Sequence, residues 1–569
     1  MKHYLDVCRK LEKADQVLKN GRIINVFTKE IIEGDLAICN DKIIGIGHYE
    51  GKEEIDLEGK YVVPGFIDSH LHIESSMISP SEFAHAVLPF GTTTLIADPH
   101  EIANVSGLDG IDYMLKESEQ APLSIYYMLP SCVPATPMES SGAILDAAKM
   151  EKYINHPRIL GVGEMMNYPG VLFGDESVLA KIKVAGDKIV DGHAPHVKGD
   201  DLVAYAFSGI HTDHECSEIE EVIERLRLGM VVQIRKGTAA NNLNDIVSEL
   251  VKTHLPLTNC VFCTDDKHLE HIFEDGHINS NIRESISLGI EPIEAICMAT
   301  LYPARVYSLR HKGALAPGYD ADLVILDNLE TVAVNRVMTK GKWYEQEPST
   351  TAKRYDAYTT VQNTVHCDPI SEEDLIIPLS QSKAHVIGLI DGQIITKKLV
   401  EEVPVENGYF KANETYSKIA VIERHHNTGN KAVAILKNFS IKNGAIAQTI
   451  AHDSHNIVCV GDNDADMVLA VNTLIEKQGG IVLVSEGKVL DHLNLPIAGL
   501  ISTLSAKQVT HKLKEMLDAA KALGINPQAD PFLTLAFLAL PVIPEIKITD
   551  KGLFDVGAFK HIPVEFISE

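Results

Sequence analysis

Two histidines separated by a single residue give the strongest chemical signal in this sequence. His70 and His72 lie in the segment FIDSHLHIESS. Side chains alternate between the two faces of a β-strand, so both imidazoles are predicted to point to the same side. Two nitrogens aimed at one point can bind a divalent cation. Asp68 shares this face, and we expect it to orient one of the imidazoles or to serve an additional metal.

Four further side chains of metal-binding type end other short apolar runs. Glu164 ends ILGVGE, His193 ends KIVDGH, His214 ends GIHTDH, and Asp265 ends CVFCTD. Each one alone is typical of a hydrogen-bonded polar residue at a junction between a strand and a loop. Their common position at strand ends is much harder to attribute to chance. The set predicts a metal site if the fold brings these strand ends together.

A repeating pattern between about Val62 and Tyr307 supplies such a fold. Short β-rich runs recur, and each is followed by a stretch with helical apolar spacing. The runs are FIDSHLH, TTTLIAD, SIYYMLP, ILGVGE, KIVDGH, GIHTDH, MVVQIR and CVFCTD. Eight such units over about 245 residues have the size of a (β/α)8 barrel, in which the carboxyl ends of the strands converge on one site. Periodicity alone leaves a doubly wound α/β sheet open.

The remaining sequence predicts two more units. Alternating apolar and polar residues with turns such as Asn20-Gly21 indicate antiparallel strands, and HKGALAPGYDADLVILD is a β-rich segment after the barrel that could join them. Glycine-rich strand ends in the last third indicate an α+β region. We therefore predict a small β domain (1–61 and 308–345), a barrel (62–307), a linker (346–369) and a C-terminal α+β domain (370–569).

Composition limits the partners that this chain is expected to have. The 569 residues contain 51 Lys and Arg against 79 Asp and Glu, a net charge of −28, which disfavours nucleic acid and anionic membranes. The most apolar run, FLTLAFLALPVIP, is shorter than the roughly 20 residues that span a bilayer. Nine scattered cysteines and an N-terminus without a signal-peptide pattern predict a reducing, cytoplasmic location. A small-molecule substrate fits these features best.

Several long motifs resemble the amidohydrolase superfamily and, within it, the bacterial adenine deaminases. They are PGFIDSHLHIESS, GVGEMMNYPGV, DGHAPHVKG, TDHE, CTDDK and GALAPGYDADLVIL, followed in the C-terminal region by IAHDSHNIVCVGDND and LPIAGLIS. The resemblance implies hydrolysis of adenine to hypoxanthine and ammonia with two divalent metals, usually manganese or iron. Zinc also suits a mixed histidine and carboxylate site. Glu164 stands where many binuclear relatives carry a carboxylated lysine, which resembles the adenine deaminase pattern.

The roles of the site residues follow from this resemblance. We assign His70, His72 and Asp265 to one metal and His193 and His214 to the other, with Glu164 as the bridge. Asp265 is also expected to accept a proton from the attacking water.

The segment ADPHEIANV supplies further groups. In it, Glu101 is the candidate proton shuttle, a role typically worth about 10² to 10⁴ in rate. Asp98 and His100 are expected to support the ligands or to bind an additional metal. A turn whose polar groups satisfy one another is the alternative for this segment.

Candidate substrate contacts lie in two other places. Arg235 and Lys236 follow the seventh predicted strand and could bind the purine edge, although a solvated loop explains them equally well. His452 and His455 lie in a polar cluster for which a surface turn is the default interpretation. The alternative is that the C-terminal domain caps the barrel mouth. We also expect a homo-oligomer, a dimer, with adenine as its small-molecule partner.

Two other functions remain open at this stage. The first is a different amidohydrolase reaction on the same scaffold, such as cyclic-amide hydrolysis or deacetylation. The second is a non-catalytic scaffold that kept the fold and lost the chemistry. The complete set of predicted metal ligands argues against the second, because such a protein would normally have lost some of them.

Overall fold

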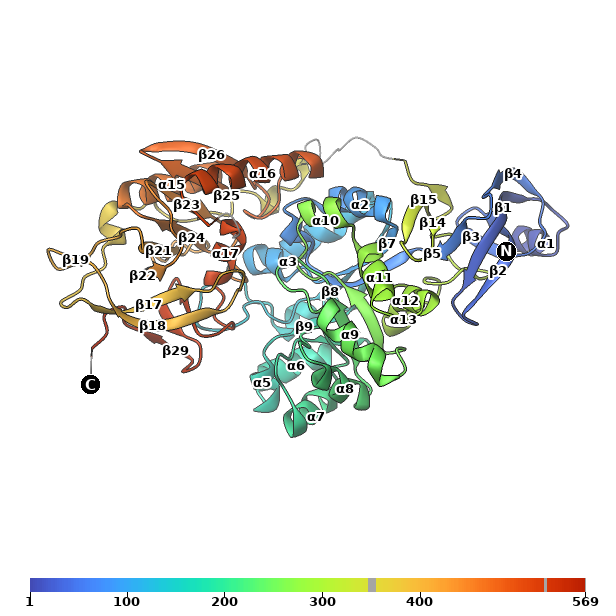
Figure 1. Cartoon of the computed structure of the whole chain (residues 1–569), viewed down its shortest axis with the longest axis horizontal. Coiled ribbons are helices and arrows are strands. Elements are labelled where there is room, and N and C mark those ends of the chain that lie inside the picture. Colours follow the sequence, from blue (N-terminus) through green and yellow to red (C-terminus); the bar gives the residue numbers. More distant parts are fainter. Residues whose placement is uncertain (346–354, 527–529, 568–569) are drawn as a thin grey trace.

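The chain forms three units that lie in a row (Figure 1). The computed structural model describes residues 1–345, 355–526 and 530–567. The amino-terminal strands lie at one end, the (β/α) unit in the middle and the C-terminal region at the other end. Part of the predicted linker, 346–354, lies outside the described residues. Among the helices that are described, none has the length and apolar character needed to cross a membrane.

The middle unit is built from parallel strands that are joined by helices. Five strands pair in the order β10-β9-β8-β7-β6 and three pair in the order β11-β12-β13. Every neighbouring pair is parallel. The strands are β6 (Phe66–Leu71), β7 (Thr92–Ala97), β8 (Ser124–Leu129), β9 (Ile159–Met165), β10 (Ile189–Gly192), β11 (Thr212–Asp213), β12 (Val231–Arg235) and β13 (Cys260–Cys263).

Backbone hydrogen bonds join the two groups of strands on both sides. The amide of Asp265, just after β13, donates to the carbonyl of His70 on β6 at 2.9 Å. The amide of His211, just before β11, donates to the carbonyl of Val190 on β10 at 3.0 Å. The eight strands therefore close into one barrel. The predicted (β/α)8 fold is confirmed, and the doubly wound sheet was the wrong alternative.

Helices cover the outside of the barrel, which explains why its strands are apolar on both faces. Strands β7 and β13 are buried along their whole length. Helix α8, with the sequence IEEVIERLR, buries Val222 against this surface. The helices of this unit are α2 (Pro80–Val87), α3 (His100–Glu117), α4 (Ala147–Met150), α5 (Tyr168–Leu172), α6 (Glu176–Val184), α7 (Gly199–Phe207), α8 (Ile219–Arg227), α9 (Leu243–Thr253), α10 (Leu269–Asp275), α11 (Ile278–Ser287), α12 (Pro292–Met298) and α13 (Leu301–Val306).

Segments before and after the barrel form one small β sheet. Its order is β16-β15-β14-β5-β1-β2-β3, with β4 also paired to β1. Strand β5 pairs with β14, which follows the barrel in the sequence. The first segment of this β domain therefore ends at Pro64, whereas we predicted residue 61. The elements are α1 (Lys2–Cys8), β1 (Ala14–Asn25), β2 (Glu30–Cys39), β3 (Lys42–Ile46), β4 (Gly51–Asp56), β5 (Tyr61–Pro64), β14 (Leu323–Asn328), β15 (Ala333–Thr339) and β16 (Lys342–Trp343).

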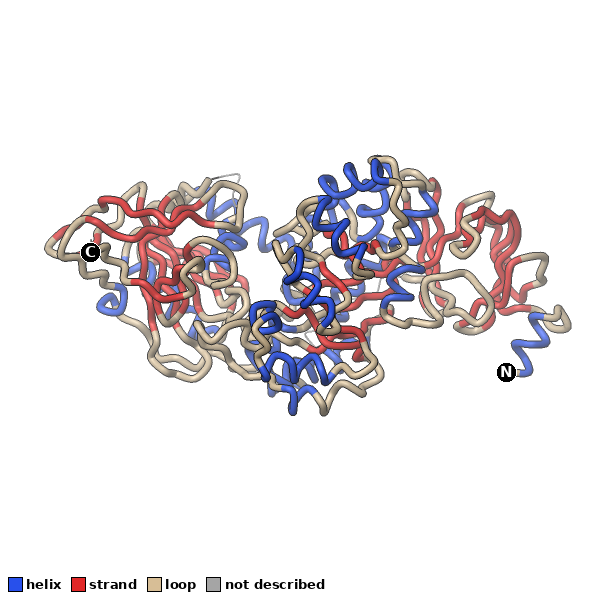
Figure 2. Tube along the Cα trace, turned by 90° about the horizontal axis from the view of Figure 1, so that it is seen from below, coloured by secondary structure: helices blue, strands red, loops and turns tan. Residues whose placement is uncertain are grey.

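The C-terminal unit is a second mixed sheet with helices packed on it (Figure 2). Its order is β18-β17-β22-β21-β24-β23-β25-β26. The strands are β17 (Lys383–Leu389), β18 (Thr396–Glu402), β21 (Tyr416–Ile422), β22 (Lys431–Lys437), β23 (Gly444–Gln448), β24 (Ile457–Gly461), β25 (Gly480–Ser485) and β26 (Lys488–Asn494). The helices are α15 (Asp464–Lys477), α16 (Ala506–Ala522) and α17 (Pro531–Leu538). The short strands are β19 (Val405–Glu406), β20 (Tyr409–Phe410), β27 (Ile546–Thr549), β28 (Gly552–Asp555) and β29 (Lys560–Ile562).

This C-terminal unit contacts loops that follow the first barrel strands. The amide of Ser502 donates to the carbonyl of Met77 at 2.8 Å. The side-chain amide of Asn456 donates to the carbonyl of Ser140 at 2.9 Å. The loop 449–456 between β23 and β24 therefore lies at the end of the barrel where the strand ends converge.

A buried ion pair fixes two of these strand ends. Arg225 on α8 is fully buried; its Nε donates to Oδ2 of Asp213 at 2.9 Å, and its Nη2 donates to the carbonyl of Ala194 at 2.9 Å. The other oxygen of Asp213 accepts from the amides of Ala194 and Glu215 at 3.2 Å and 2.9 Å. The pair thus holds residues that flank two of the predicted metal ligands.

Replacing Arg225 with methionine would leave Asp213 as a buried charge without its partner. Breaking a buried pair in this way costs about 3–5 kcal/mol, so Arg225→Met is expected to lower the free energy of unfolding by about that amount. Chemical denaturation followed by circular dichroism measures the effect. Arg227→Met, at an exposed position of the same helix, is the control and should stay within about 0.5 kcal/mol. An equal loss of unfolding free energy in both variants would contradict the stabilising role of the pair of Arg225 and Asp213.

Candidate metal centre

Six side chains of metal-binding type meet at the carboxyl ends of the barrel strands. Two come from the end of β6 and one from β9, and the others follow β10, β11 and β13 directly. All are buried except one histidine, whose side chain is 19% exposed. The six are His70, His72, Glu164, His193, His214 and Asp265. The structure thus brings together every residue that was predicted to bind the two metals.

The two carboxylate oxygens of Glu164 face different groups of histidines. Its Oε1 lies 3.3 Å from Nε2 of His72 and 3.8 Å from Nε2 of His70. Its Oε2 lies 2.8 Å from Nδ1 of His193 and 3.4 Å from Nε2 of His214. One carboxylate therefore stands between two sets of nitrogen donors, which is the arrangement that a bridging ligand requires.

Asp265 completes the first of these sets. Its Oδ1 lies 3.2 Å from Nε2 of His72 and 3.9 Å from Nε2 of His70, and the donor atoms of the three residues lie within 4.8 Å of one another. The backbone of Asp265 is in the left-handed region, with φ of 55°. This turn comes directly after β13 and is uncommon outside glycine.

The environment of His70 fits a bound cation. Its Nε2 is buried and has no hydrogen-bond partner among the described residues. A buried polar atom left without a partner is costly unless a ligand satisfies it. Burial and the neighbouring His214 hold the pKa of His70 well below its usual range, which favours the neutral imidazole that binds metals. Imidazoles with carboxylates form a donor set suited to manganese, iron or zinc.

Asp98 holds two of the six side chains in place. Nδ1 of His72 donates to the backbone carbonyl of Asp98 at 2.9 Å, which leaves Nε2 of the same ring with its lone pair toward the site. The carboxylate of Asp98 accepts from the backbone amide of Glu164 at 3.0 Å. The supporting position predicted for Asp98 agrees with these contacts.

Asp68 has a different role from the one predicted. Its carboxylate accepts from the amides of His70 and Thr264 at 3.3 Å and 3.2 Å and from the Thr264 hydroxyl at 2.6 Å. The nearest ring nitrogen is Nε2 of His277, at 3.2 Å. Asp68 therefore joins β6 to the end of β13, and its carboxylate contacts the backbone of His70 and not the imidazole.

Arg235 contacts Asp265, one of the six residues of the centre. Its Nη1 donates to Oδ2 of Asp265 at 2.8 Å and also bonds to Glu215. Burial raises the pKa of Asp265, but the hydrogen bond with His72 and the charge of Arg235 outweigh it and hold that pKa well below its usual range. Arg235 thus keeps Asp265 ionised and fixed in orientation.

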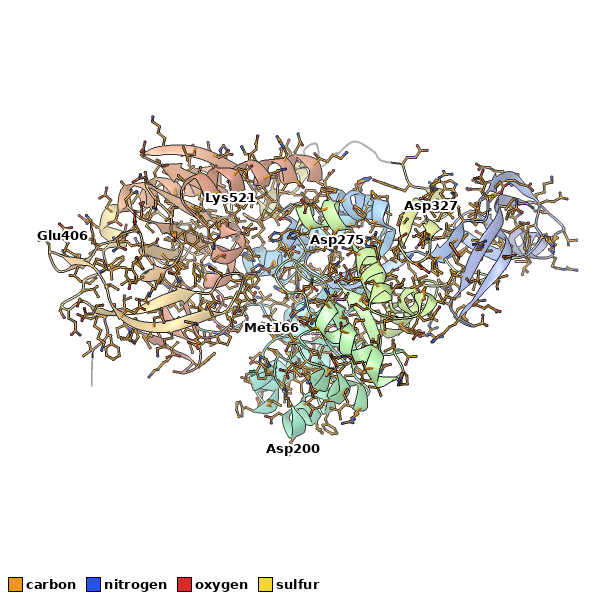
Figure 3. The ribbon with its side chains drawn as sticks, in the orientation of Figure 1. Met166, Asp200, Asp275, Asp327, Glu406 and Lys521 are labelled. Carbon is orange, nitrogen blue, oxygen red and sulfur yellow. The ribbon has the colours of Figure 1, made fainter. Side chains whose placement is uncertain are left out.

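Lys236 points away from the centre. Its Nζ lies 2.6 Å from the carboxylate of Asp275, which is labelled in Figure 3, and 2.5 Å from that of Glu284. Neighbouring side chains on a strand face opposite ways, so Arg235 and Lys236 could not both enter the site. The substrate contact of Lys236 stays a prediction.

Glu101 is held by two histidines from the C-terminal unit. It lies in the first turn of α3 and is 2% exposed. One of its oxygens accepts from Nδ1 of His452 and the other from Nε2 of His455. The default interpretation of these two histidines as a surface turn was therefore wrong. Both are buried and reach into the barrel unit.

These contacts affect the charges around Glu101. Burial raises the pKa of Glu101, but the charges of His452 and His455 outweigh it and hold that pKa well below its usual range. Burial lowers the pKa of His452, but Glu101 overcomes this and raises it to about 9. His100 lies between this group and the metal ligands, with Nδ1 at 3.3 Å from Glu164 and Nε2 at 3.4 Å from Glu101.

Three further residues beside the centre were not predicted from the sequence as site residues. Glu215 lies 3.4 Å from Nε2 of His214 and pairs with Arg235. Its position directly after His214 in the TDHE motif was the available signal. Cys132 and Asp453 form a buried group with His100. Cys132 follows β8 closely, so the position of strand ends could have indicated it, whereas Asp453 lies far from the barrel in sequence.

A narrow cavity of about 20 Å³ lies between the barrel and the C-terminal unit. Its barrel side includes Ser75 and Asp266, which are joined by a hydrogen bond. His452, which contacts Glu101, also lines the cavity. The lining residues are Ser75, Met77, Asp266, His268, Gln448, Ile450, His452, Phe532, Leu533 and Ala536.

Family models match both large parts of the chain. The amidohydrolase family matches residues 61–344, and the adenine deaminase C-terminal domain matches residues 393–560. The barrel and its centre thus define a divalent-metal-dependent hydrolase of the amidohydrolase family.

Curated relatives align with nearly the whole chain. It is 49% identical to the adenine deaminase of Clostridium acetobutylicum, over 97% of this chain and 98% of that one. It is 46% identical to the adenine deaminase of Desulfitobacterium hafniense, over 97% and 96%. It is also 46% identical to adenine deaminase 2 of Carboxydothermus hydrogenoformans, over 99% of each. The chain therefore belongs to the adenine deaminase family.

Glu164→Gln tests the bridging position. A glutamine offers one carbonyl oxygen and no charge, so it cannot serve both histidine sets, and we expect the variant to retain fewer metal ions per chain. Elemental analysis of the purified protein measures this. Glu176→Gln, at the exposed start of α6, is the matched control and should keep the wild-type metal content. Unchanged metal content in Glu164→Gln would contradict the bridge.

Replacing His452 and His455 together by alanine tests whether their contact with Glu101 matters for turnover. If Glu101 transfers protons, kcat should fall by about 10² to 10⁴, while metal content stays at the wild-type level. Steady-state kinetics with adenine and elemental analysis provide the two readouts. His511→Ala, at an exposed position on α16, is the control. A double variant with wild-type kcat would remove the functional role of this contact.

Proposed function

We propose that this chain hydrolyses adenine to hypoxanthine and ammonia. The names of its relatives supply the reaction, and the position of Glu164 carries the argument for the chemistry. The two oxygens of this carboxylate face two separate sets of imidazoles at the mouth of the barrel. This arrangement favours a centre with two divalent cations over a centre with one.

The proposed ligands divide between two cations. His70, His72 and Asp265 would hold the first, His193 and His214 would hold the second, and Glu164 would be shared. When bound, the cations supply Lewis-acid activation of water, whose pKa can fall from about 15.7 to about 7. We propose manganese or iron as the native metal, with zinc compatible with the same donors.

Asp265 is the proposed acceptor of the proton that water loses as it attacks C6 of adenine. Its Oδ1 faces the imidazoles of the first set, while Arg235 holds its Oδ2 at 2.8 Å. The lowered pKa of Asp265 keeps it ionised, so the carboxylate can accept a proton. Arg235 also holds this carboxylate in a fixed orientation.

Glu101 is the proposed shuttle that delivers protons to N1 of the ring and to the departing amine. It is ionised and buried, and His452 connects it to the cavity between the two units. The apolar wall of that cavity, including Met77, Ile450 and Phe532, suits a flat purine ring, and Gln448 offers a polar contact.

We also propose an oligomeric state and a cellular location for this chain. We propose that the chain forms a homodimer, and that it works in the cytoplasm without nucleic-acid or membrane partners. All nine cysteines are free thiols, which supports a reducing location. The net charge of −28 supports the absence of polyanionic partners.

Ammonia release from a panel of compounds tests the proposed reaction. Metal-loaded protein should release ammonia from adenine and leave cyclic amides and N-acetyl compounds unchanged. Treatment with a chelator should abolish the release, and added manganese or iron should restore it. Asp265→Asn should reduce turnover severely, because an amide cannot accept the proton. Absence of ammonia from adenine, with hydrolysis of a cyclic amide, would favour the other amidohydrolase reactions.

A further inference from the structure

A second buried group of metal-binding side chains lies beside the six-residue centre. One donor atom each from His100, Cys132 and Asp453 lies within 4.8 Å of the other two. The three residues are 3%, 3% and 2% exposed. They come from the start of α3, the loop after β8 and the loop between β23 and β24. Nitrogen, sulfur and oxygen donors from three distant segments are thus gathered at one point.

The orientation of His100 leaves one nitrogen for this group. Its Nδ1 lies 3.3 Å from Oε1 of Glu164 and 3.7 Å from Oδ1 of Asp98, both of which are acceptors. A proton on Nδ1 suits these neighbours and leaves the lone pair on Nε2. Nε2 lies 3.8 Å from Oδ1 of Asp453 and 3.4 Å from Oε1 of Glu101. An acceptor that fixes the other ring nitrogen is the usual support of a metal-binding histidine.

Asp453 has an unsatisfied oxygen at this place. Its Oδ2 is buried and has no hydrogen-bond partner among the residues that the structure describes. The nearby Glu101 is already occupied by His452 and His455. A buried carboxylate with an unpaired oxygen is expensive unless a cation compensates it. The unpaired oxygen of Asp453 is an observation independent of the distances between donor atoms, and both indicate a binding site for a cation.

We propose that His100 Nε2, Cys132 Sγ and the carboxylate of Asp453 bind a third divalent cation beside Glu101. The sulfur donor distinguishes this site from the centre at Glu164 and selects thiolate-binding ions such as zinc, iron or cobalt over manganese. The Cys132 thiol releases its proton to solvent when the cation binds. Because Asp453 belongs to the C-terminal unit, the cation cross-links that unit to the barrel beside Glu101.

Cobalt is a suitable probe for this site. The full-length chain is stripped of metal, reloaded with excess Co²⁺ and freed of unbound ion, and cobalt per chain is then measured together with the near-ultraviolet spectrum. We expect a thiolate-to-cobalt charge-transfer band in the wild type. Cys132→Ser should lose that band and about one equivalent of cobalt. Asp453→Asn should bind the same ion more weakly and show a weaker band at limiting cobalt.

Two controls separate this site from other sources of the signal. Cys459→Ser removes a buried thiol of the C-terminal sheet, whose Sγ contacts the carbonyl of Met467, and should keep both band and stoichiometry. Glu164→Gln should lose cobalt from the six-residue centre and keep the thiolate band. Failure of the two-cation centre is thus distinguishable from failure of this site. A wild type without a thiolate band, or equal cobalt in wild type and Cys132→Ser, would overturn the proposal.

Discussion

The position of one buried carboxylate constrains the rest of the site. Glu164 is 2% exposed, and a carboxylate in that environment is costly unless donors or cations surround it. Four imidazoles from three different strand ends supply those surroundings. The barrel is the element that makes this possible, because it brings the carboxyl ends of strands that are distant in sequence to a single point.

The strand ends must in turn be held still. Asp98 fixes the backbone amide of Glu164 and the ring of His72 together. The buried pair of Arg225 and Asp213 fixes the loops after β10 and β11. A displacement of about 1 Å can be expensive for a positioned catalytic group. The support behind the ligands is therefore as much a part of the centre as the ligands themselves.

The C-terminal unit contributes side chains to the end of the barrel where the carboxyl ends of the strands converge. His452 and His455 engage both oxygens of Glu101, which lies about 350 residues earlier in the chain. Asp453, between them, faces His100. The loop between β23 and β24 thus brings three polar side chains to one end of α3. This contact links the family's characteristic C-terminal domain to the chemistry proposed for the barrel.

The sequence by itself indicated the eight barrel strands and the six side chains that meet at their carboxyl ends, because apolar runs that end in a residue of metal-binding type are a local pattern. It could not determine which hydrogen-bond partner each neighbouring polar side chain takes. Asp68 accepts a hydrogen bond from Thr264 and Arg235 donates to Asp265, and both contacts join segments that are distant in sequence. The sequence predicted that the segments flanking the barrel share one β domain, and the tertiary structure alone decided that this sheet includes β5, residues Tyr61–Pro64. It also decided that His452 meets Glu101, since that contact depends on packing between distant segments.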